Sequence, residues 1–433
     1  MRRLDSSAAD FPAAFDRLVR DRRESDDDVA RDVADILNEV KLRGDEAVAE
    51  YTAEFDGHAL GTEPGADWRI APEACREAFD ALDPALRAAL ELAAQRIRIY
   101  HEDQLPKPRD FTDAQNVRMG ARWLPVDAAG LYVPGGRAAY PSSLLMNAIP
   151  AKVAGVGRLV VVTPTPNGQI NPLVLAAAHL AGVDELWRIG GAQAVAALAY
   201  GTKRIAPVDV ITGPGNAWVA EAKRQLYGVV GIDMVAGPSE ILVIADSAND
   251  PEWIAADLMS QAEHDPAAQA ILITDDAKFA DRVADHVAVE LAMLPTAKVA
   301  RESWAAHGTI IVVRDLATEG PALANRLAAE HVELAVADPE AMFAAIRHAG
   351  SVFLGRMTPE AVGDYVAGPN HVLPTGRRAR FASGLSVLDF MKRTSFISLG
   401  DGALEAIGPA AIALAEAEGL SAHARSIELR LGI

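Results

Sequence analysis

The sequence contains only one cysteine, Cys75, in 433 residues. A single cysteine excludes an intrachain disulfide framework and a cysteine-based zinc ribbon. Uninterrupted apolar stretches stay well below the roughly 20 residues that a helix needs to span a bilayer. The N-terminal stretch is basic but lacks the apolar segment of a secretory signal. We therefore expect a reducing, cytoplasmic setting with no membrane partner.

Positive charge is also scarce. The formal net charge is −19 and the isoelectric point is about 5.0. Neither a nucleic acid nor an anionic membrane would be attracted to such a surface, so these partners are not expected. Half of the residues are hydrophobic and 23% are charged, which is typical of a globular protein. The length is sufficient for two or three domains with cores of their own.

Strand-like and helix-like segments alternate along most of the chain. RLVVVTPTP, ELWRIGG and DVITGPG are apolar runs that end at Pro or Gly, and a second series of the same form begins near residue 250. Such alternation indicates parallel sheets covered by helices. It predicts an α/β fold of two related, incomplete Rossmann-like domains, doubly wound and mostly parallel. From about residue 390 the pattern predicts a helical tail without a complete core, which must pack on something such as a partner subunit.

Three glycine-rich turns follow strand-like runs: YVPGG (132–136), IGGAQA (189–194) and TGPGNAW (212–218). Glycine lets a backbone approach a ligand closely, and a helix N-terminus after the turn favours a phosphate. Ligands of open α/β sheets bind beyond the carboxyl ends of the strands. None of the turns is the G-x-G-x-x-G fingerprint. Together they predict a nucleotide cleft, although each alone is also compatible with an ordinary tight turn.

Four histidines lie in dense polar settings. His264 ends SQAEHDP, three residues after Gln261. The others are His331 directly after Glu330, His371 seven residues after Asp364, and His423 five residues after Glu418. Imidazole, carboxylate and amide groups suit a zinc-like ion bound through nitrogen and oxygen. Spacing alone also allows solvated helix ends, and the absence of H-E-x-x-H argues against a common type of zinc protease.

The adjacent Glu330 and His331 suggest proton transfer. A histidine with a pKa near 6.5 is a natural general base at neutral pH, and the carboxylate adds a second proton acceptor. From the residues alone, two functions stay open. They are a metallohydrolase that activates water and a non-catalytic nucleotide-binding protein.

Long ordered segments of the chain closely resemble the histidinol dehydrogenase family. They include GLYVPGGRAAYPSSLLMNAIPAKVAGV, VDVITGPGNAWVAEAKRQL, DLMSQAEHDP, AEHVELAV, AGDYVAGPNHVLPT and AEAEGLSAHARSIELR. The resemblance runs from roughly residue 25 to the end, and no family position is altered. It implies oxidation of L-histidinol to L-histidine through histidinaldehyde, with reduction of two NAD, as the last step of histidine biosynthesis. AAYPSSLLMNAIPA and AEAEGLSAH follow the form specific for histidinol.

The resemblance also implies roles for individual residues in a homodimer with shared active sites and one zinc ion per subunit. The implied zinc ligands are Gln261, His264, Asp364 and His423, the last from the partner subunit's tail. Substrate contacts would come from these four and from Ser239, His331, His371 and Glu418. NAD-binding positions are Tyr132, Gln193 and Asn216, and the proton acceptors are Glu330 and His331.

Domain boundaries are expected from the same pattern. An N-terminal helical segment covers 1–28, and a discontinuous α/β domain with the zinc and base residues covers 29–131 and 241–385. A second α/β domain with the NAD-binding turns covers 132–240. A helical tail exchanged between the subunits of the dimer covers 386–433.

Overall fold

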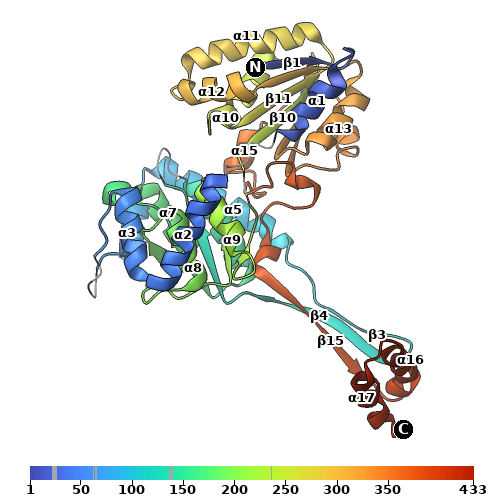
Figure 1. Cartoon of the computed structure of the whole chain (residues 1–433). Helices are drawn as coiled ribbons and strands as arrows, with labels where there is room; N and C mark the ends of the chain where they lie inside the picture. Colours follow the sequence, from blue (N-terminus) through green and yellow to red (C-terminus); the bar gives the residue numbers. More distant parts are fainter. Residues whose placement is uncertain (22–26, 62, 64–65, 136–139, 236) are drawn as a thin grey trace.

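The computed structural model describes residues 1–433 except 22–26, 62, 64–65, 136–139 and 236. Two α/β bodies, each built on a six-stranded sheet, lie next to each other, and a long β-ribbon carries the C-terminal helices away from them (Figure 1). The prediction of a mixed α/β fold with mostly parallel sheets is confirmed. No helix of the described part is long and apolar enough to cross a membrane.

The first body contains the glycine-rich turns. Its sheet has the strand order β2(Arg69–Ile70), β7(Glu185–Trp187), β6(Arg158–Val162), β5(Ala128–Tyr132), β8(Val210–Thr212), β9(Gly231–Ile232), with only β2 antiparallel to its neighbour. The helices of one face are α4(Pro72–Asp80), α5(Pro84–Asp103), α6(Pro141–Ala154) and α7(Pro172–Ala181). Those of the other are α2(Asp27–Arg43), α3(Asp45–Asp56), α8(Gly191–Tyr200) and α9(Ala217–Leu226). A short 3₁₀ helix, Pro166–Gly168, precedes α7.

The second body contains the acid and histidine motifs. Its sheet is parallel throughout, in the order β1(Arg2–Asp5), β12(Thr309–Val312), β11(Gln269–Thr274), β10(Glu240–Ala245), β13(His331–Ala335), β14(Ser351–Leu354). One face packs on α10(Pro251–Ala262), α11(Ala277–Met293) and α12(Ala297–His307). The opposite face packs on α1(Phe11–Arg20), α13(Leu316–Leu327) and α14(Pro339–Phe343), while α15(Glu360–Tyr365) follows β14.

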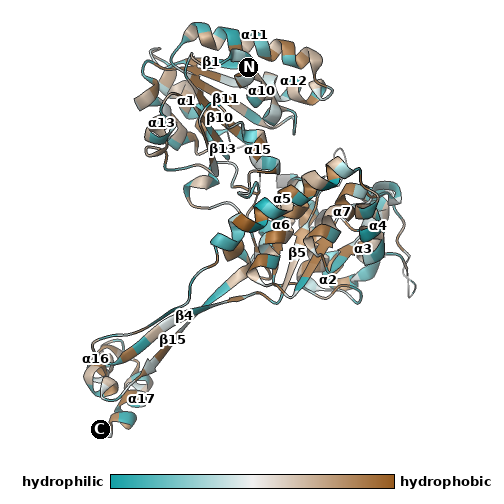
Figure 2. Ribbon diagram, turned by 180° about the vertical axis from the view of Figure 1, so that it is seen from behind, coloured by the Kyte–Doolittle hydropathy of each residue, from teal (hydrophilic) through white to brown (hydrophobic). Residues whose placement is uncertain are grey.

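Both sheets share one topology. The first sheet contains the five consecutive strands β5–β9, and the second contains β10–β14. When each set of five is renumbered from one to five along the chain, both sheets have the spatial order 3-2-1-4-5. In each sheet an additional strand pairs at the edge next to strand 3. This is the Rossmann order without its sixth strand. Hydrophobic residues fill the strands and the inner helix faces (Figure 2) because a sheet covered on both sides has no solvent-exposed face. The prediction of two related Rossmann-like units therefore agrees with the strand order.

Sheet membership differs from the predicted domain boundaries. Those boundaries group residues 29–131 with 241–385, but α2 to α5 and the strands β2 and β5 belong to the first body. The cut at 131/132 falls inside β5, which is central in its sheet. The segment 1–28 is not merely helical, because β1 pairs in parallel with β12 and Leu4 packs against the core of the second body.

The C-terminal tail is a ribbon before it is helical. β15(Met391–Leu399) pairs antiparallel with β4(Val117–Pro125), and β3(Arg109–Thr112) pairs with the other edge of β4. Two short 3₁₀ helices, Arg378–Arg380 and Val387–Phe390, lead into the ribbon. At its far end lie α16(Ala403–Ala417) and α17(Ser421–Leu431) (Figures 1 and 2). The start of the predicted helical tail is therefore a strand.

Candidate active site

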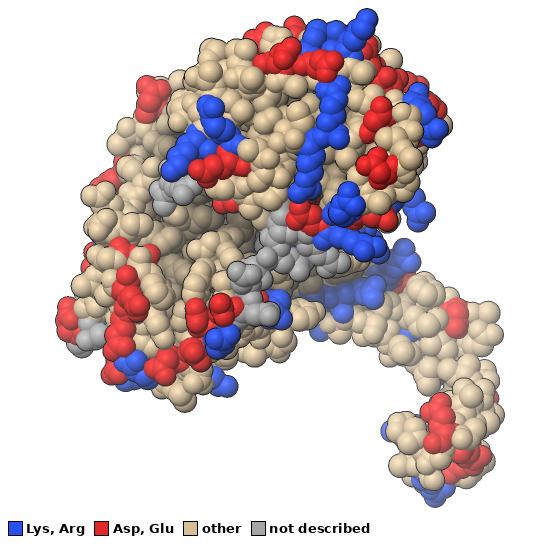
Figure 3. All heavy atoms as spheres, turned by 45° about the horizontal axis from the view of Figure 1, so that its top comes forward, with Lys and Arg blue, Asp and Glu red and all other residues tan. Residues whose placement is uncertain are grey.

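The acid and histidine residues gather at the amino ends of strands in the second sheet. Ser239 directly precedes β10, Glu330 directly precedes β13, and His331 is the first residue of β13. The parallel register places His331 beside Ile241, so Glu330 and Glu240 are neighbours at the same edge. The glycine-rich turns, in contrast, follow the carboxyl ends of strands in the first sheet. The surface is hollowed between the two bodies (Figure 3).

His331 is buried in a fixed orientation. Its Nδ1 lies 3.1 Å from the carbonyl oxygen of Glu240. Because a carbonyl only accepts, Nδ1 carries the hydrogen and Nε2 keeps its lone pair. Nε2 lies 3.5 Å from Glu360 Oε1 and 3.9 Å from Asp364 Oδ1, and it has no hydrogen-bond partner among the described residues. Burial lowers the pKa of His331 to about 4, so the ring is neutral and able to accept a proton at Nε2.

Glu330 is buried next to His331, and Glu240 holds it as well. Its Oε2 accepts the backbone N–H of Glu240 at 2.9 Å and lies 3.7 Å from Nδ1 of His331. Burial raises the pKa of Glu330 well above its ordinary value because ionisation in an apolar site is unfavourable. A carboxyl group with a raised pKa is a stronger base than a solvated one, which suits proton transfer near neutral pH.

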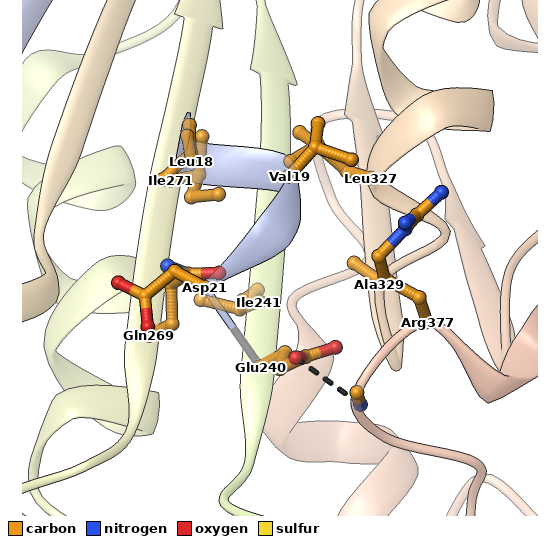
Figure 4. Close-up of a pocket in the computed structure, with 11 residues that line it drawn as sticks. Leu18, Val19, Asp21, Glu240, Ile241, Gln269, Ile271, Leu327, Ala329 and Arg377 are labelled. Carbon is orange, nitrogen blue, oxygen red and sulfur yellow. Dashed lines mark hydrogen bonds between the residues drawn. The ribbon is translucent and has the colours of Figure 1, made fainter. Parts of the chain in front are cut away.

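Glu240 also anchors this edge through its side chain. Glu240 Oε1 accepts the backbone N–H of Gly376 at 3.2 Å, the dashed line in Figure 4. Glu240 also lines a cavity of about 10 Å³, together with residues that include Leu18, Gln269 and Arg377. This cavity is too small for anything larger than a water molecule. The cavity is therefore a small packing void at this edge of the sheet and cannot hold a substrate.

Helix α15 brings two acids to Nε2 of His331. Glu360 and Asp364 are one helical turn apart, and together with His331 they offer ligand atoms that lie within 4.8 Å of one another. Nδ1 of His371 lies 2.9 Å from the backbone oxygen of Asp364 and 3.7 Å from its Oδ1. Burial raises the pKa of Glu360 to about 8 and lowers the pKa of His371. His331, Asp364 and His371 are thus brought together as expected.

Gln261 lies in the last turn of helix α10, and His264 lies in the turn that follows it, beside the same cluster. Gln261 is only 1% exposed and its Oε1 has no hydrogen-bond partner in the described part of the chain. His264 is exposed, and its backbone N–H donates to the Gln261 carbonyl at 3.3 Å. Burial lowers the pKa of His331 and of His371, and the nearby His264 ring lowers both further. The buried free amide oxygen, the imidazole nitrogens and the Asp364 carboxylate fit a zinc ion.

Two of the expected site residues lie elsewhere. Glu418 follows α16 and His423 lies on α17, and both are exposed. These helices stand at the far end of the ribbon, away from α10 and α15 of the same chain (Figure 1). The structure of one chain therefore does not bring Glu418 or His423 to the cluster.

The three glycine-rich turns converge at one end of the first sheet. The Tyr132 hydroxyl accepts the backbone N–H of Gly191 at 3.1 Å, which joins the first turn to the second. Gly213 has φ +111°, and a Cβ there would lie 2.2 Å from the carbonyl oxygen of Tyr132, so only glycine fits. Burial raises the pKa of Tyr132 to about 12. Gly136 and the next three residues, where the first turn ends, lie outside the described residues.

Gln193 and Asn216 occupy different environments in these turns. Gln193 is 1% exposed, and neither its Oε1 nor its Nε2 has a hydrogen-bond partner among the described residues. A buried amide without partners is costly, so it fits a group supplied by a ligand such as NAD. Asn216 caps α9 by accepting the N–H groups of Trp218 and Val219, each at 3.1 Å.

Several supporting residues are missed by sequence reasoning. Glu240 holds Glu330 and His331 through its backbone, which every residue type has, so no sequence signal could have identified this role. Glu360 could have been found, because it lies four residues before Asp364 on the same helical face. The buried Lys223 pairs with Asp233, and both contact the backbone of Gly213 at 2.9 Å, which fixes the third turn.

Comparison with known proteins shows similarity over the whole chain. The family model described as histidinol dehydrogenase matches residues 19–431. Histidinol dehydrogenase of Zymomonas mobilis is 64% identical over 99% of both chains, and that of Rhodospirillum rubrum is 62% identical over 99% of this chain and 98% of the relative. The crystal structure of histidinol dehydrogenase from Elizabethkingia anophelis superposes with a TM-score of 0.93 at 34% identity, covering 100% of this chain and 98% of that one.

Proposed function

This chain belongs to the histidinol dehydrogenase family, as an NAD-dependent oxidoreductase of histidine biosynthesis that oxidises L-histidinol, and we propose that the cluster between β13, α10 and α15 is its active site. One observation carries the assignment to these residues. The neutral ring of His331 is held by Glu240 so that its unpartnered Nε2 faces Asp364 and Glu360. A positioned, unprotonated imidazole is what removal of a hydroxyl proton requires.

We propose that zinc binds to Gln261, His264, Asp364 and the partner subunit's His423, one ion per subunit. The unpartnered buried Oε1 of Gln261 supports this set. When bound, the ion would orient the substrate and act as a Lewis acid. Ser239, His371 and the partner subunit's Glu418 would contact the substrate together with the residues that hold the ion. NAD would bind at Tyr132, Gln193 and Asn216, for which the two free amide atoms of Gln193 are the support.

Proton transfer is divided between the two neighbours in this proposal. His331 Nε2 accepts the hydroxyl proton of histidinol as hydride passes to the first NAD. Glu330 then accepts a proton from the water that adds to the aldehyde carbonyl. His331 accepts a proton from the resulting hydrate as a second hydride passes to the second NAD, which leaves the carboxylate of histidine. The first oxidation thus removes one hydride and one proton. The second removes one hydride and two protons, one accepted by Glu330 and one by His331, which has released its first proton before that step.

Glu330→Gln is expected to slow oxidation of the aldehyde more than oxidation of the alcohol. The amide can still accept the Glu240 N–H, so the edge keeps its hydrogen bond, but it cannot take a proton from water. Single-turnover measurements that start from histidinol or from histidinaldehyde separate the two steps. Equal losses in both steps would contradict the divided roles.

A homodimer with shared active sites is supported by the tail. In the single chain, large apolar residues of the ribbon and its helices are open to solvent, among them Ile397 (73% exposed), Leu414 (65%) and Leu429 (61%). Several large apolar side chains left exposed on one small unit are typical of an interface. Docking of the tail on a second subunit would cover it and bring in Glu418 and His423. We also propose a cytoplasmic location, where the reaction can draw on the NAD pool.

Subunit mixing tests whether the site is shared. His331→Asn and His423→Ala are each expected to inactivate a homodimer, but a mixed dimer would contain one intact site made from one variant's body and the other's tail. Random pairing after co-expression should restore about a quarter of the wild-type activity. If both histidines served the same chain's site, each mixed dimer would hold two damaged sites and no activity would return.

A further inference from the structure

A second set of carboxyl groups lies on the same elements as the proposed zinc and base residues. Each of these acids shares a helix or strand with one of the proposed zinc or base residues, called the front residue here. On a helix the acid lies four positions before the front residue, and on the strand it lies two positions after it, so both lie on the same face of the element. The pairs, front residue first, are Gln261 and Asp257 on α10, His331 and Glu333 on β13, and Asp364 and Glu360 on α15. None of these three acids is among the site residues expected from the sequence.

Glu333 is the member that touches the other two elements. It is 1% exposed, its carboxyl group faces that of Asp257 within reach of a shared proton, and it also faces the backbone N–H of Glu360, while its Oε2 has no other hydrogen-bond donor among the described residues. A single side chain thus connects β13 with α10 and with the first residue of α15. An acid buried so completely is costly unless it is hydrogen-bonded, so this bridge holds the three elements in register.

Ser260 ties the two helices together beside this bridge. Its Oγ lies 3.3 Å from Oε2 of Glu360 and 2.8 Å from the backbone oxygen of Asp257. Ser260 is also the residue directly before Gln261. The distance between the helix end that carries Gln261 and the helix that carries Asp364 is therefore set by Glu333, Ser260 and their partners.

We propose that Glu333 is a positioning residue, which fixes α10 and α15 against β13 so that Gln261 and Asp364 can bind one zinc ion together. The inference rests on the proposed zinc site. A ligand shell tolerates deviations of only a few tenths of an ångström, and outer partners that orient ligands typically contribute about 10- to 100-fold in metal affinity. Glu333 itself touches neither the ion nor the substrate in this proposal.

Glu333→Ala tests the proposal through zinc affinity of the full-length dimer, measured by competition with a chromophoric chelator. We expect about 10- to 100-fold weaker binding. The visible absorption spectrum of the Co²⁺-substituted dimer should change as well, because it reports ligand geometry. Glu333→Gln keeps a donor for Asp257 and an acceptor for Glu360 N–H, so it should bind zinc like the wild type.

Glu185→Ala is the matched control. Glu185 is a partly buried carboxylate of the first sheet, bound to Arg158 at 2.7 Å, and its loss should lower stability without changing zinc affinity. Should Glu333→Ala not fold, Ser260→Ala carries the test, since it removes one hydroxyl and is expected to weaken zinc by about tenfold. Wild-type affinity and an unchanged Co²⁺ spectrum in a folded Glu333→Ala or Ser260→Ala dimer would overturn the inference. A wild-type dimer that binds no zinc would overturn the zinc site, and the inference with it.

Discussion

His331→Asn is expected to lower kcat by about 10²- to 10⁴-fold, the range that general base catalysis contributes. The Asn amide can still donate to the Glu240 carbonyl, so the local backbone arrangement is kept. What disappears is the lone pair at Nε2, and an amide nitrogen cannot replace it. Because both oxidations use this base in the proposed mechanism, both should slow.

Turnover of L-histidinol with NAD and the zinc content of the same preparation together decide this prediction. We expect zinc to stay at the wild-type level. His331 also lies within ligand distance of Glu360 and Asp364, so a variant that loses its zinc would instead make His331 a ligand. Normal turnover in a zinc-loaded variant would remove His331 from the mechanism.

His264→Ala is expected to remove zinc and activity together. The loss of zinc affinity should exceed the about 10- to 100-fold that an outer partner contributes, since one of four proposed ligands is deleted. His264 is exposed, and surface substitutions usually change the free energy of unfolding by no more than about 0.5 kcal/mol. Loss of zinc in this variant therefore cannot be attributed to unfolding.

His179→Ala provides the matched control for His264→Ala. His179 is an exposed histidine on α7 in the first body, where its ring contacts Phe79. It should keep both zinc and activity. Metal analysis of the two dialysed variants, with circular dichroism to verify folding, is the measurement. Activity retained by metal-free His264→Ala protein would exclude a catalytic zinc at this position.

Local patterns in the sequence are sufficient for much of the fold. Apolar runs that end at Pro or Gly identify the parallel strands, and helix spacing identifies Gln261 with His264 as neighbours. Adjacent Glu330 and His331 can be recognised as proton acceptors because their chemistry depends on residue type. Roles that depend on the backbone cannot be recognised, and the part of Glu240 in holding both residues is the main example.

Non-local pairing is the part that sequence cannot supply. Nothing in the short segment Arg2–Asp5 indicates that it pairs with β12, and its charge-rich texture predicts helix. β4 has its partner strand β15 near the other end of the chain, so neither can be identified as half of a ribbon. The same applies to Glu333, because its partners Asp257 and Glu360 come from other elements and become neighbours only in the folded body.

The ribbon also has a consequence for synthesis on the ribosome. β4 and its neighbour β3 are made early, but β15, which pairs with the other edge of β4, begins only at Met391, after the strands of both α/β sheets. Domains generally fold as units during synthesis, so the two bodies can form before β15 pairs with β4. The tail that a second subunit would receive therefore acquires its structure later than the two bodies. The active sites of the proposed dimer can therefore be completed only after the ribbon has formed, so dimer assembly follows the folding of the two bodies.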